Sequence, residues 1–139
     1  MKIALQAYLK GSIEAVEFYK KAFGATLGFN AKNPDGTFMH AELNVDGKLL
    51  LALSESNNHI DLENRTKYAR TSYPTMNFCV IFQNEEPVKK AYEVLKEDAN
   101  ILLPLGSLPW SSCCANLIDK FGVFWYIAVH VQNRPESES

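Results

Sequence analysis

A histidine and a glutamate stand two residues apart in the stretch "TFMHAELNV", in which polar and apolar residues alternate. Alternation with a period of two predicts a β-strand, and residues i and i+2 of a strand share one face, about 7 Å apart. A carboxylate beside an imidazole can orient it as a proton acceptor or as a donor to a ligand. His40 and Glu42 are therefore the candidate catalytic residues. The alternative is a hydrogen-bonded pair that only fixes strand pairing or a dimer contact.

The same strand predicts which side chains line a cavity. Phe38 and Asn44 have the parity of His40 and Glu42, so we expect these four to face the concave side of the sheet. The intervening apolar residues should pack against helices: Met39, Ala41, Leu43 and Val45.

A second chemical segment is "WSSCCANLIDKFGVFWYI", which contains adjacent cysteines. Cys113 and Cys114 would point to opposite faces of a strand, which argues against a two-thiol metal clamp. With Cys79 the count of cysteines is odd, so a disulfide framework is not expected. For Cys113 and Cys114, small half-buried residues are favoured over reactive thiols.

Strand parity also predicts an aromatic surface. If Cys114 faces the cavity, the adjacent strand presents Tyr126 on one face and Trp125 on the other, with Trp110 at the rim. Aromatic rings with polar tips suit a small, flat or apolar ligand. Plain core packing is the alternative for each ring.

The elements around these residues follow one order twice. Apolar residues recur at helical spacing in the stretch after Ser12, which is the expected N-cap, and Gly24 is the expected stop. A second helix, with Pro87 in its first turn, should bury Val88, Ala91, Tyr92 and Leu95. Strands are expected at 3–9, 25–32, 37–45, 49–55, 75–83, 100–105, 111–118 and 123–131.

This order predicts an α+β fold made of two βαβββ modules. We expect the first module at 1–55, a linker at 56–74, the second module at 75–131 and a disordered tail at 132–139, all within one structural domain.

Composition narrows the function. The chain has 139 residues, 47% of them hydrophobic and 22% charged, as in ordinary globular domains. A net charge of −2 gives no basic footprint for nucleic acid or for an anionic membrane. No apolar run reaches the roughly 18 residues of a membrane span, and the first residues do not form a signal-peptide pattern, so we expect a cytoplasmic protein.

The motifs "QAYL", "AVEFYKKAFGA", "HAELNVDGKLLLALSE" and "WSSCCANLIDKFGVFWYI" together resemble the vicinal oxygen chelate superfamily. Within it, the chain is most similar to the PhnB-like branch of the glyoxalase, bleomycin-resistance and dioxygenase proteins. The resemblance implies that the two modules form curved four-stranded sheets around a cleft and that the protein is a homodimer.

The resemblance also implies where metal ligands would lie. Counting from the shared motifs, those positions hold Gln6 (or Ala4), Leu51, Asn77 and Tyr126. Leucine does not bind metals, and amides and phenols are poor ligands for a transition ion. We therefore expect no metal and no other cofactor. A displaced site would need His40 and Glu42, with Cys114 as a third ligand.

The sequence thus predicts a small-molecule-binding protein with an aromatic-lined cleft, and leaves open whether it is an enzyme. If the protein is an enzyme, we expect a lyase- or isomerase-like activity. The alternatives are a metal-dependent lyase, isomerase or dioxygenase, a drug-sequestering resistance protein, and a structural or regulatory dimer. A methyltransferase is not supported, because no glycine-rich cofactor loop follows a strand. The expected ligand-binding residues are Gln6, Tyr8, Phe38, His40, Asn77, Trp110, Cys114 and Tyr126.

Overall fold

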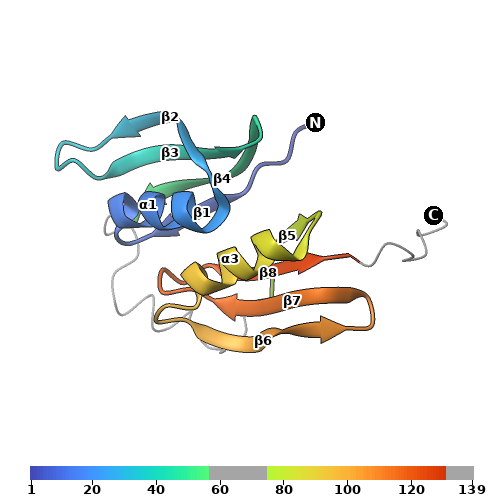
Figure 1. Cartoon of the computed structure of the whole chain (residues 1–139). Helices are drawn as coiled ribbons and strands as arrows, with labels where there is room; N and C mark the ends of the chain where they lie inside the picture. The colour runs from blue at the N-terminus through green and yellow to red at the C-terminus, as the bar shows by residue number, and fades with distance from the viewer. Residues whose placement is uncertain (57–74, 131–139) are drawn as a thin grey trace. The chain divides into compact units, whose positions relative to one another are not determined.

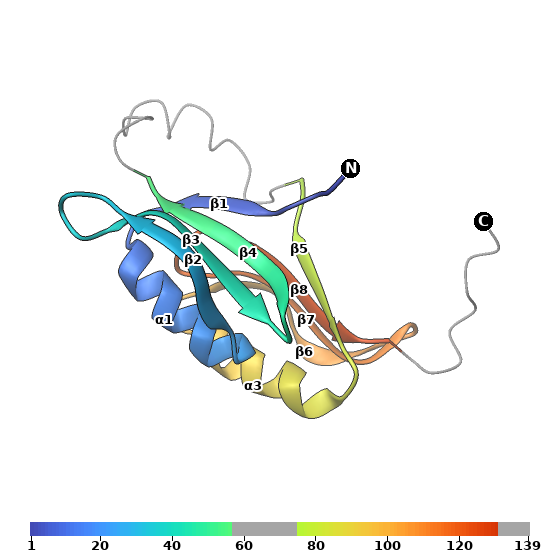
Figure 2. The same cartoon turned by 90° about the horizontal axis from the view of Figure 1, so that it is seen from above.

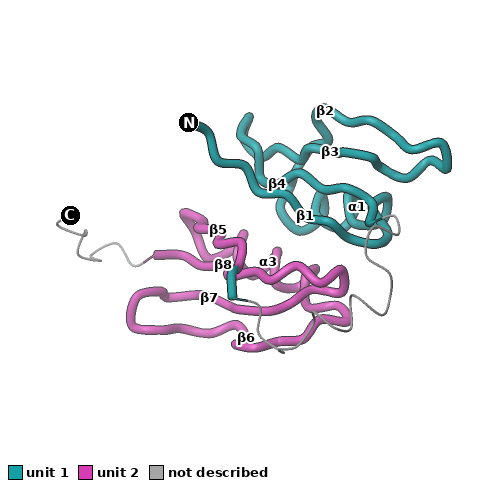
Figure 3. Tube along the Cα trace, turned by 180° about the vertical axis from the view of Figure 1, so that it is seen from behind, with its two compact units in different colours: residues 1–76 teal, residues 77–139 magenta. Residues whose placement is uncertain are grey.

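The structure is a computed structural model that describes residues 1–56 and 75–130. The chain divides into two compact units, Met1–Met76 and Asn77–Ser139 (Figure 3). Among the described residues, each unit contains one helix and one four-stranded sheet in the order βαβββ, which confirms the α+β prediction. Apart from Ser56, the linker expected at 56–74 lies outside the described residues, as does the tail expected at 132–139.

In the first unit the sheet has the order β1-β4-β3-β2, and α1 runs along one of its faces (Figures 1 and 2). Strand β1 is parallel to β4, and the other neighbours are antiparallel. The elements are β1 (Gln6–Leu9), α1 (Ser12–Phe23), β2 (Thr26–Lys32), β3 (Phe38–Val45) and β4 (Lys48–Glu55).

The ends of α1 are fixed in two different ways. Gly24 ends the helix as predicted, with a φ of 67° that suits glycine. The prediction that Ser12 is the N-cap is wrong, because Gly11 takes that position and the buried Ser12 hydroxyl accepts the N–H of Phe38 at 2.9 Å. The first N–H groups instead donate to the Glu55 carboxylate, Gly11 at 3.0 Å and Ser12 at 2.8 Å. A side chain at the end of β4 therefore caps α1.

The face of this sheet toward α1 is apolar. Leu43 lies opposite Leu51, and Ala41 lies opposite Leu53. All four side chains are fully buried. Their burial confirms the inward parity expected for Ala41 and Leu43.

Two irregularities in the pairing of β2 with β3 interrupt this parity. Between Leu27 and Asn30, β2 has one residue more than the facing part of β3, and at Met39 it is β3 that has the extra residue. Met39 is 56% exposed and does not join the core as expected. Phe38 is only 5% exposed, so it does not share the half-buried environment of His40. A one-residue bulge explains the change, because it shifts side chains between the faces of a strand.

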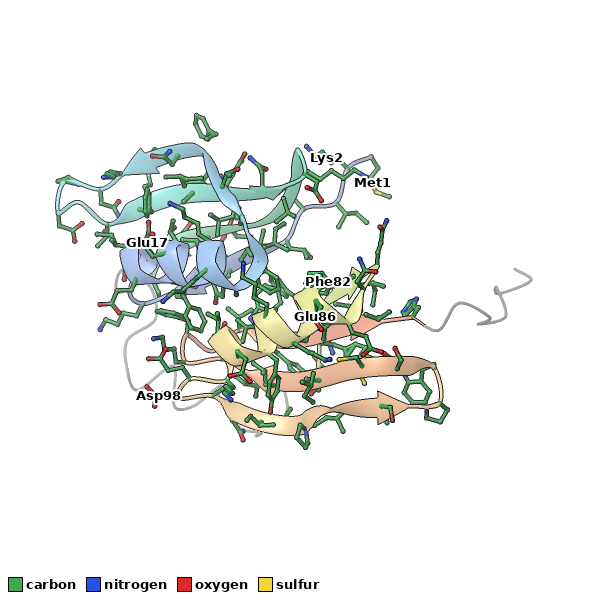
Figure 4. The ribbon with its side chains drawn as sticks, in the orientation of Figure 1. Met1, Lys2, Glu17, Phe82, Glu86 and Asp98 are labelled. Carbon is green, nitrogen blue, oxygen red and sulfur yellow. The ribbon has the colours of Figure 1, made fainter. Side chains whose placement is uncertain are left out.

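In the second unit the sheet has the order β5-β8-β7-β6, with β5 parallel to β8. Helix α3 buries Val88, Ala91, Tyr92 and Leu95, as predicted. The turn that follows α3 contains Asp98 (Figure 4). Asp98 has a φ of 53°. The elements are β5 (Phe78–Phe82), α3 (Glu85–Leu95), β6 (Asn100–Leu108), β7 (Ser111–Ile118) and β8 (Phe124–Val129).

Strand β6 extends beyond the predicted end at residue 105, because it pairs along the whole of β7 as far as Leu108 opposite Ser111. The fully buried Trp125 and Ile127 of β8 alternate with the half-buried Phe124 and Tyr126, as the predicted parity requires.

The turn between β7 and β8 is held by a buried carboxylate. One oxygen of Asp119 accepts the N–H groups of Phe121 at 2.8 Å and Val123 at 3.1 Å, and the other accepts the indole N–H of Trp125 at 2.8 Å. Gly122 has a φ of 88°, a backbone conformation that glycine adopts more easily than other residues. In the described ranges, 1–56 and 75–130, there is no helix with the length and apolar character of a membrane span.

Candidate functional site

The predicted pair on β3 is in contact. Nε2 of His40 lies 3.0 Å from an oxygen of Glu42, and the two side chains are 33% and 36% exposed. In the next strand Ala52 lies opposite Glu42, and beyond it Gln6 of β1 lies opposite Ala52. The Gln6 amide donates to the Ser54 hydroxyl at 2.9 Å. These five residues form the side of the sheet away from α1, which we call the first open face.

Phe29 belongs to this face and was not predicted. Its ring centroid lies 6.1 Å from that of His40, and the residue is 69% exposed. The irregularity in β2 places it there, and Gly28 is part of that irregularity. A Cβ on Gly28 would lie only 2.4 Å from Nδ2 of Asn44. A glycine within a predicted strand was the available signal, because it often marks a bulge or a close approach.

The other predicted residues of this unit do not lie within the first open face as defined above. Tyr8 lies opposite Ser54 and is 74% exposed, so it borders the first open face. Leu51 is fully buried opposite Leu43, on the α1 side, so it does not lie beside Gln6 as the motif count implied. Ala52 holds that place. A hollow in this unit is lined by residues 2–5 and 47–50. Of the predicted site positions, these ranges include only Ala4, the alternative to Gln6 in the implied ligand set.

On the second sheet, the predicted aromatic residues meet. The indole N–H of Trp110, at the turn between β6 and β7, donates to the Tyr126 hydroxyl at 3.1 Å. Cys114 is fully buried and interacts with the same hydroxyl. Trp110 itself remains 48% exposed. We call Trp110, Cys114 and Tyr126 the second open face.

The surroundings of Tyr126 disfavour its phenolate. Burial raises the pKa of Tyr126 above its ordinary value of 10.0, the hydrogen bond from Trp110 lowers it, and Cys114 raises it again, with a net increase. Tyr126 therefore acts as a neutral hydroxyl at physiological pH.

The three cysteines form no disulfide. Burial raises the pKa of the Cys113 thiol, so its reactive thiolate is disfavoured. Cys79 is exposed on β5 opposite Tyr126. Asn77 is also exposed and directly precedes β5, in the parity of Cys79. Cys113 and Cys114 are thus more deeply buried than the half-buried positions that we expected for them.

The residues do not fit the ligand set of a metal-using relative. The amide of Gln6 is hydrogen-bonded to Ser54, Leu51 lies in the core, and the raised pKa of Tyr126 opposes a phenolate ligand. Among residues 1–56 and 75–130, no three His, Cys, Asp or Glu side chains gather closely enough to hold an ion.

Residues 12–127 match the Glyoxalase/Bleomycin resistance protein/Dioxygenase superfamily, and the chain therefore belongs to this superfamily. A search of curated proteins gave no match.

Solved structures support the same fold. One is a putative 3-demethylubiquinone-9 3-methyltransferase, PhnB protein, from Bacillus cereus, with 26% identity over 93% of this chain and 99% of that chain and a TM-score of 0.72. Another is protein PA1353 from Pseudomonas aeruginosa, with 21% identity over 93% and 98% and a TM-score of 0.68. A third is a glyoxalase/bleomycin resistance protein/dioxygenase family enzyme from Burkholderia phytofirmans PsJN, with 14% identity over 92% and 97% and a TM-score of 0.63. The predicted family and fold are confirmed.

Proposed function

We propose that the protein binds a small, flat organic molecule on the second open face and does so without a metal ion. The observation that carries this proposal is the Trp110–Tyr126 hydrogen bond, which holds a half-exposed indole against a hydroxyl that also interacts with the buried Cys114. A ring that is already oriented loses little conformational freedom when a ligand stacks on it. The neutral hydroxyl of Tyr126 adds one polar contact beside a mostly apolar surface.

Two other functions of the superfamily require different features of the site. A metal-dependent lyase, isomerase or dioxygenase needs imidazole or carboxylate ligands, and the positions inferred for them hold Gln6, Leu51, Asn77 and Tyr126. A drug-sequestering protein needs only affinity, so the second open face serves it equally well. Turnover of the bound compound is what separates an enzyme from a sequestering protein.

The test uses ligand-observed NMR with 1-naphthol, quinoline and 2-naphthoate as probes. We expect saturation transfer from the protein to at least one probe, strongly reduced by Trp110→Ala and weakened by Tyr126→Phe. Ile101→Ala is the matched control, because Ile101 is 40% exposed on β6 of the same sheet. Equal transfer in the wild type and Trp110→Ala, with circular dichroism showing both folded, contradicts the proposal.

A further inference from the structure

The first open face contains an imidazole and a carboxylate, His40 and Glu42, which take no part in the binding of a flat molecule at Trp110 and Tyr126. We propose that it is a metal-free proton-accepting site, in which His40 takes up the proton of a flat O–H acid such as a phenol or an enol. Glu42 orients the imidazole and Phe29 contacts the ring of the ligand. This inference does not rest on the proposed function, because it uses other residues in the other unit.

The hydrogen bond to Glu42 determines which ring nitrogen of His40 can accept a proton from the ligand. A carboxylate has no hydrogen to donate, so Nε2 carries the hydrogen in the 3.0 Å contact. The lone pair of the neutral ring is then on Nδ1. When Nδ1 gains a proton, Nε2 keeps its hydrogen bond to the Glu42 carboxylate, and the two side chains form an ion pair. With 33% of the His40 side chain exposed, a ligand has access to the ring.

Phe29 supplies an apolar contact beside this pair. Its ring is tilted 51° to that of His40 at a centroid distance of 6.1 Å, and the residue is 69% exposed. The bulge that turns it to this face includes Gly28, whose close approach to Asn44 limits what can replace it. Bulges commonly re-aim a side chain next to a functional site.

The residues beside the pair are small or polar. Ala52, which is 4% exposed, lies between Glu42 and Gln6 in the cross-strand row. Beyond it, the Gln6–Ser54 hydrogen bond presents an amide and a hydroxyl on the same face. A flat ligand that stacks against Phe29 thus has hydrogen-bonding groups within one sheet, which favours a phenol or enol over a purely apolar compound.

The proton transfer balances without a cofactor. The O–H bond of the ligand breaks, an Nδ1–H bond forms on His40, and the ligand oxygen keeps the electron pair as an oxyanion. The imidazolium then pairs with both the oxyanion and Glu42. No oxidant, reductant or metal takes part.

The experiment uses 4-nitrophenol, because its phenolate absorbs visible light and its phenol does not. At a pH at which most of the free probe is protonated, we expect full-length protein to increase the phenolate absorbance with a saturable dependence on concentration. His40→Gln should abolish the increase. Glu42→Gln should reduce its amplitude at saturation, since a neutral amide does not stabilise the imidazolium. Phe29→Leu should weaken binding while leaving most of that amplitude, a split that general loss of structure does not produce.

His130→Gln is the matched control, because His130 is an exposed histidine of the other unit, and it should keep the response. Trp110→Ala should keep it too, which separates this inference from the proposed function. The inference is overturned if the wild type gives no increase at saturating protein, or if His40→Gln and Glu42→Gln respond like the wild type. A response lost in Trp110→Ala but kept in His40→Gln also overturns it and moves the binding of phenols to the second open face.

Discussion

The indole N–H of Trp125 donates to Asp119 over 2.8 Å, and both residues are almost wholly buried. The other oxygen of the same carboxylate accepts two backbone N–H groups of the turn. One side chain thus fixes both the β7–β8 turn and the largest ring of the second core. This explains in physical terms why aspartate, glycine and tryptophan occur together in the segment "DKFGVFW".

Asp119→Asn should destabilise the protein. Its amide N–H₂ would face the Trp125 indole N–H, so two buried donors would lie together where a donor and an acceptor now meet. We expect a loss of about 2 kcal/mol in the free energy of unfolding, measured by urea denaturation. In a double-mutant cycle, Trp125→Phe should recover part of this loss, because it removes the opposing donor. Fully additive effects would contradict this account.

Glu55 should make the free energy of unfolding depend on pH in the acidic range. Burial acts to raise the pKa of Glu55, but hydrogen bonds from Ser12 and Gly11 outweigh it and hold the pKa below its ordinary 4.5. A lowered pKa in the folded state means that the stabilisation is complete above pH 4.5 and is lost as the pH falls through the folded value.

Glu55→Ala should therefore cost about 1 kcal/mol at neutral pH, as for the loss of a helix cap. The difference from the wild type should shrink in acid. Urea denaturation at neutral and acidic pH measures it, and Glu14→Ala, which alters an exposed acidic residue in the first turn of α1, is the control. An unchanged difference between the two pH values would count against the cap.

The pKa of Tyr126 should move in opposite directions in two variants. Trp110→Phe removes a hydrogen bond that lowers the pKa, so the pKa should rise further. Cys114→Ala removes an interaction that raises it, so the pKa should fall toward 10.0. NMR titration of ¹³C-labelled tyrosine resolves the two shifts. Shifts of the same sign would show that Trp110 and Cys114 do not act on the Tyr126 hydroxyl as described.

Protein purified without an affinity tag or chelator should contain no stoichiometric transition metal. The reason is the donor chemistry of Gln6, Leu51, Asn77 and Tyr126, together with the lack of a third ligand beside His40 and Glu42 among residues 1–56 and 75–130. Elemental analysis measures this. About one zinc, nickel, iron or manganese ion per chain, lost in His40→Ala, would contradict this prediction and favour a metal-dependent lyase, isomerase or dioxygenase.

We expect a homodimer in solution. Each four-stranded sheet ends in two edge strands, and large apolar side chains remain exposed on β1 and β3, including Tyr8 and Met39. Such edges and surfaces are commonly covered by another chain. Sedimentation equilibrium at micromolar concentration measures the mass. A monomer there would refute the expectation.

Strongly periodic elements were predictable from the sequence alone. The buried stripe of α3 was predicted residue by residue, because four apolar side chains at helical spacing leave a helix one way to bury them. The alternation of Trp125, Tyr126 and Ile127 likewise followed from the period of a strand. The first open face was predicted in part, since His40 and Glu42 share a face for the same reason.

The features that were missed depend on contacts distant in sequence or on single inserted residues. Glu55 caps a helix that begins 43 residues earlier, so no local pattern reveals it. The bulges at Gly28 and Met39 change the face of Phe29 and Phe38 without changing the composition of their strands. Counting along a strand therefore predicts a face only until the first bulge.

The parallel pairs β1–β4 and β5–β8 have a consequence for how the protein is made. In each sheet the first strand to leave the ribosome pairs with the last, so neither sheet can close until its last strand has been synthesised. A nascent chain that stops before Phe124 lacks the strand that pairs with β5, whereas the sheet of the first unit is complete at Glu55. Folding during translation should therefore proceed in two steps, and ribosomes stalled between these points should carry a folded first unit and an unfolded second one.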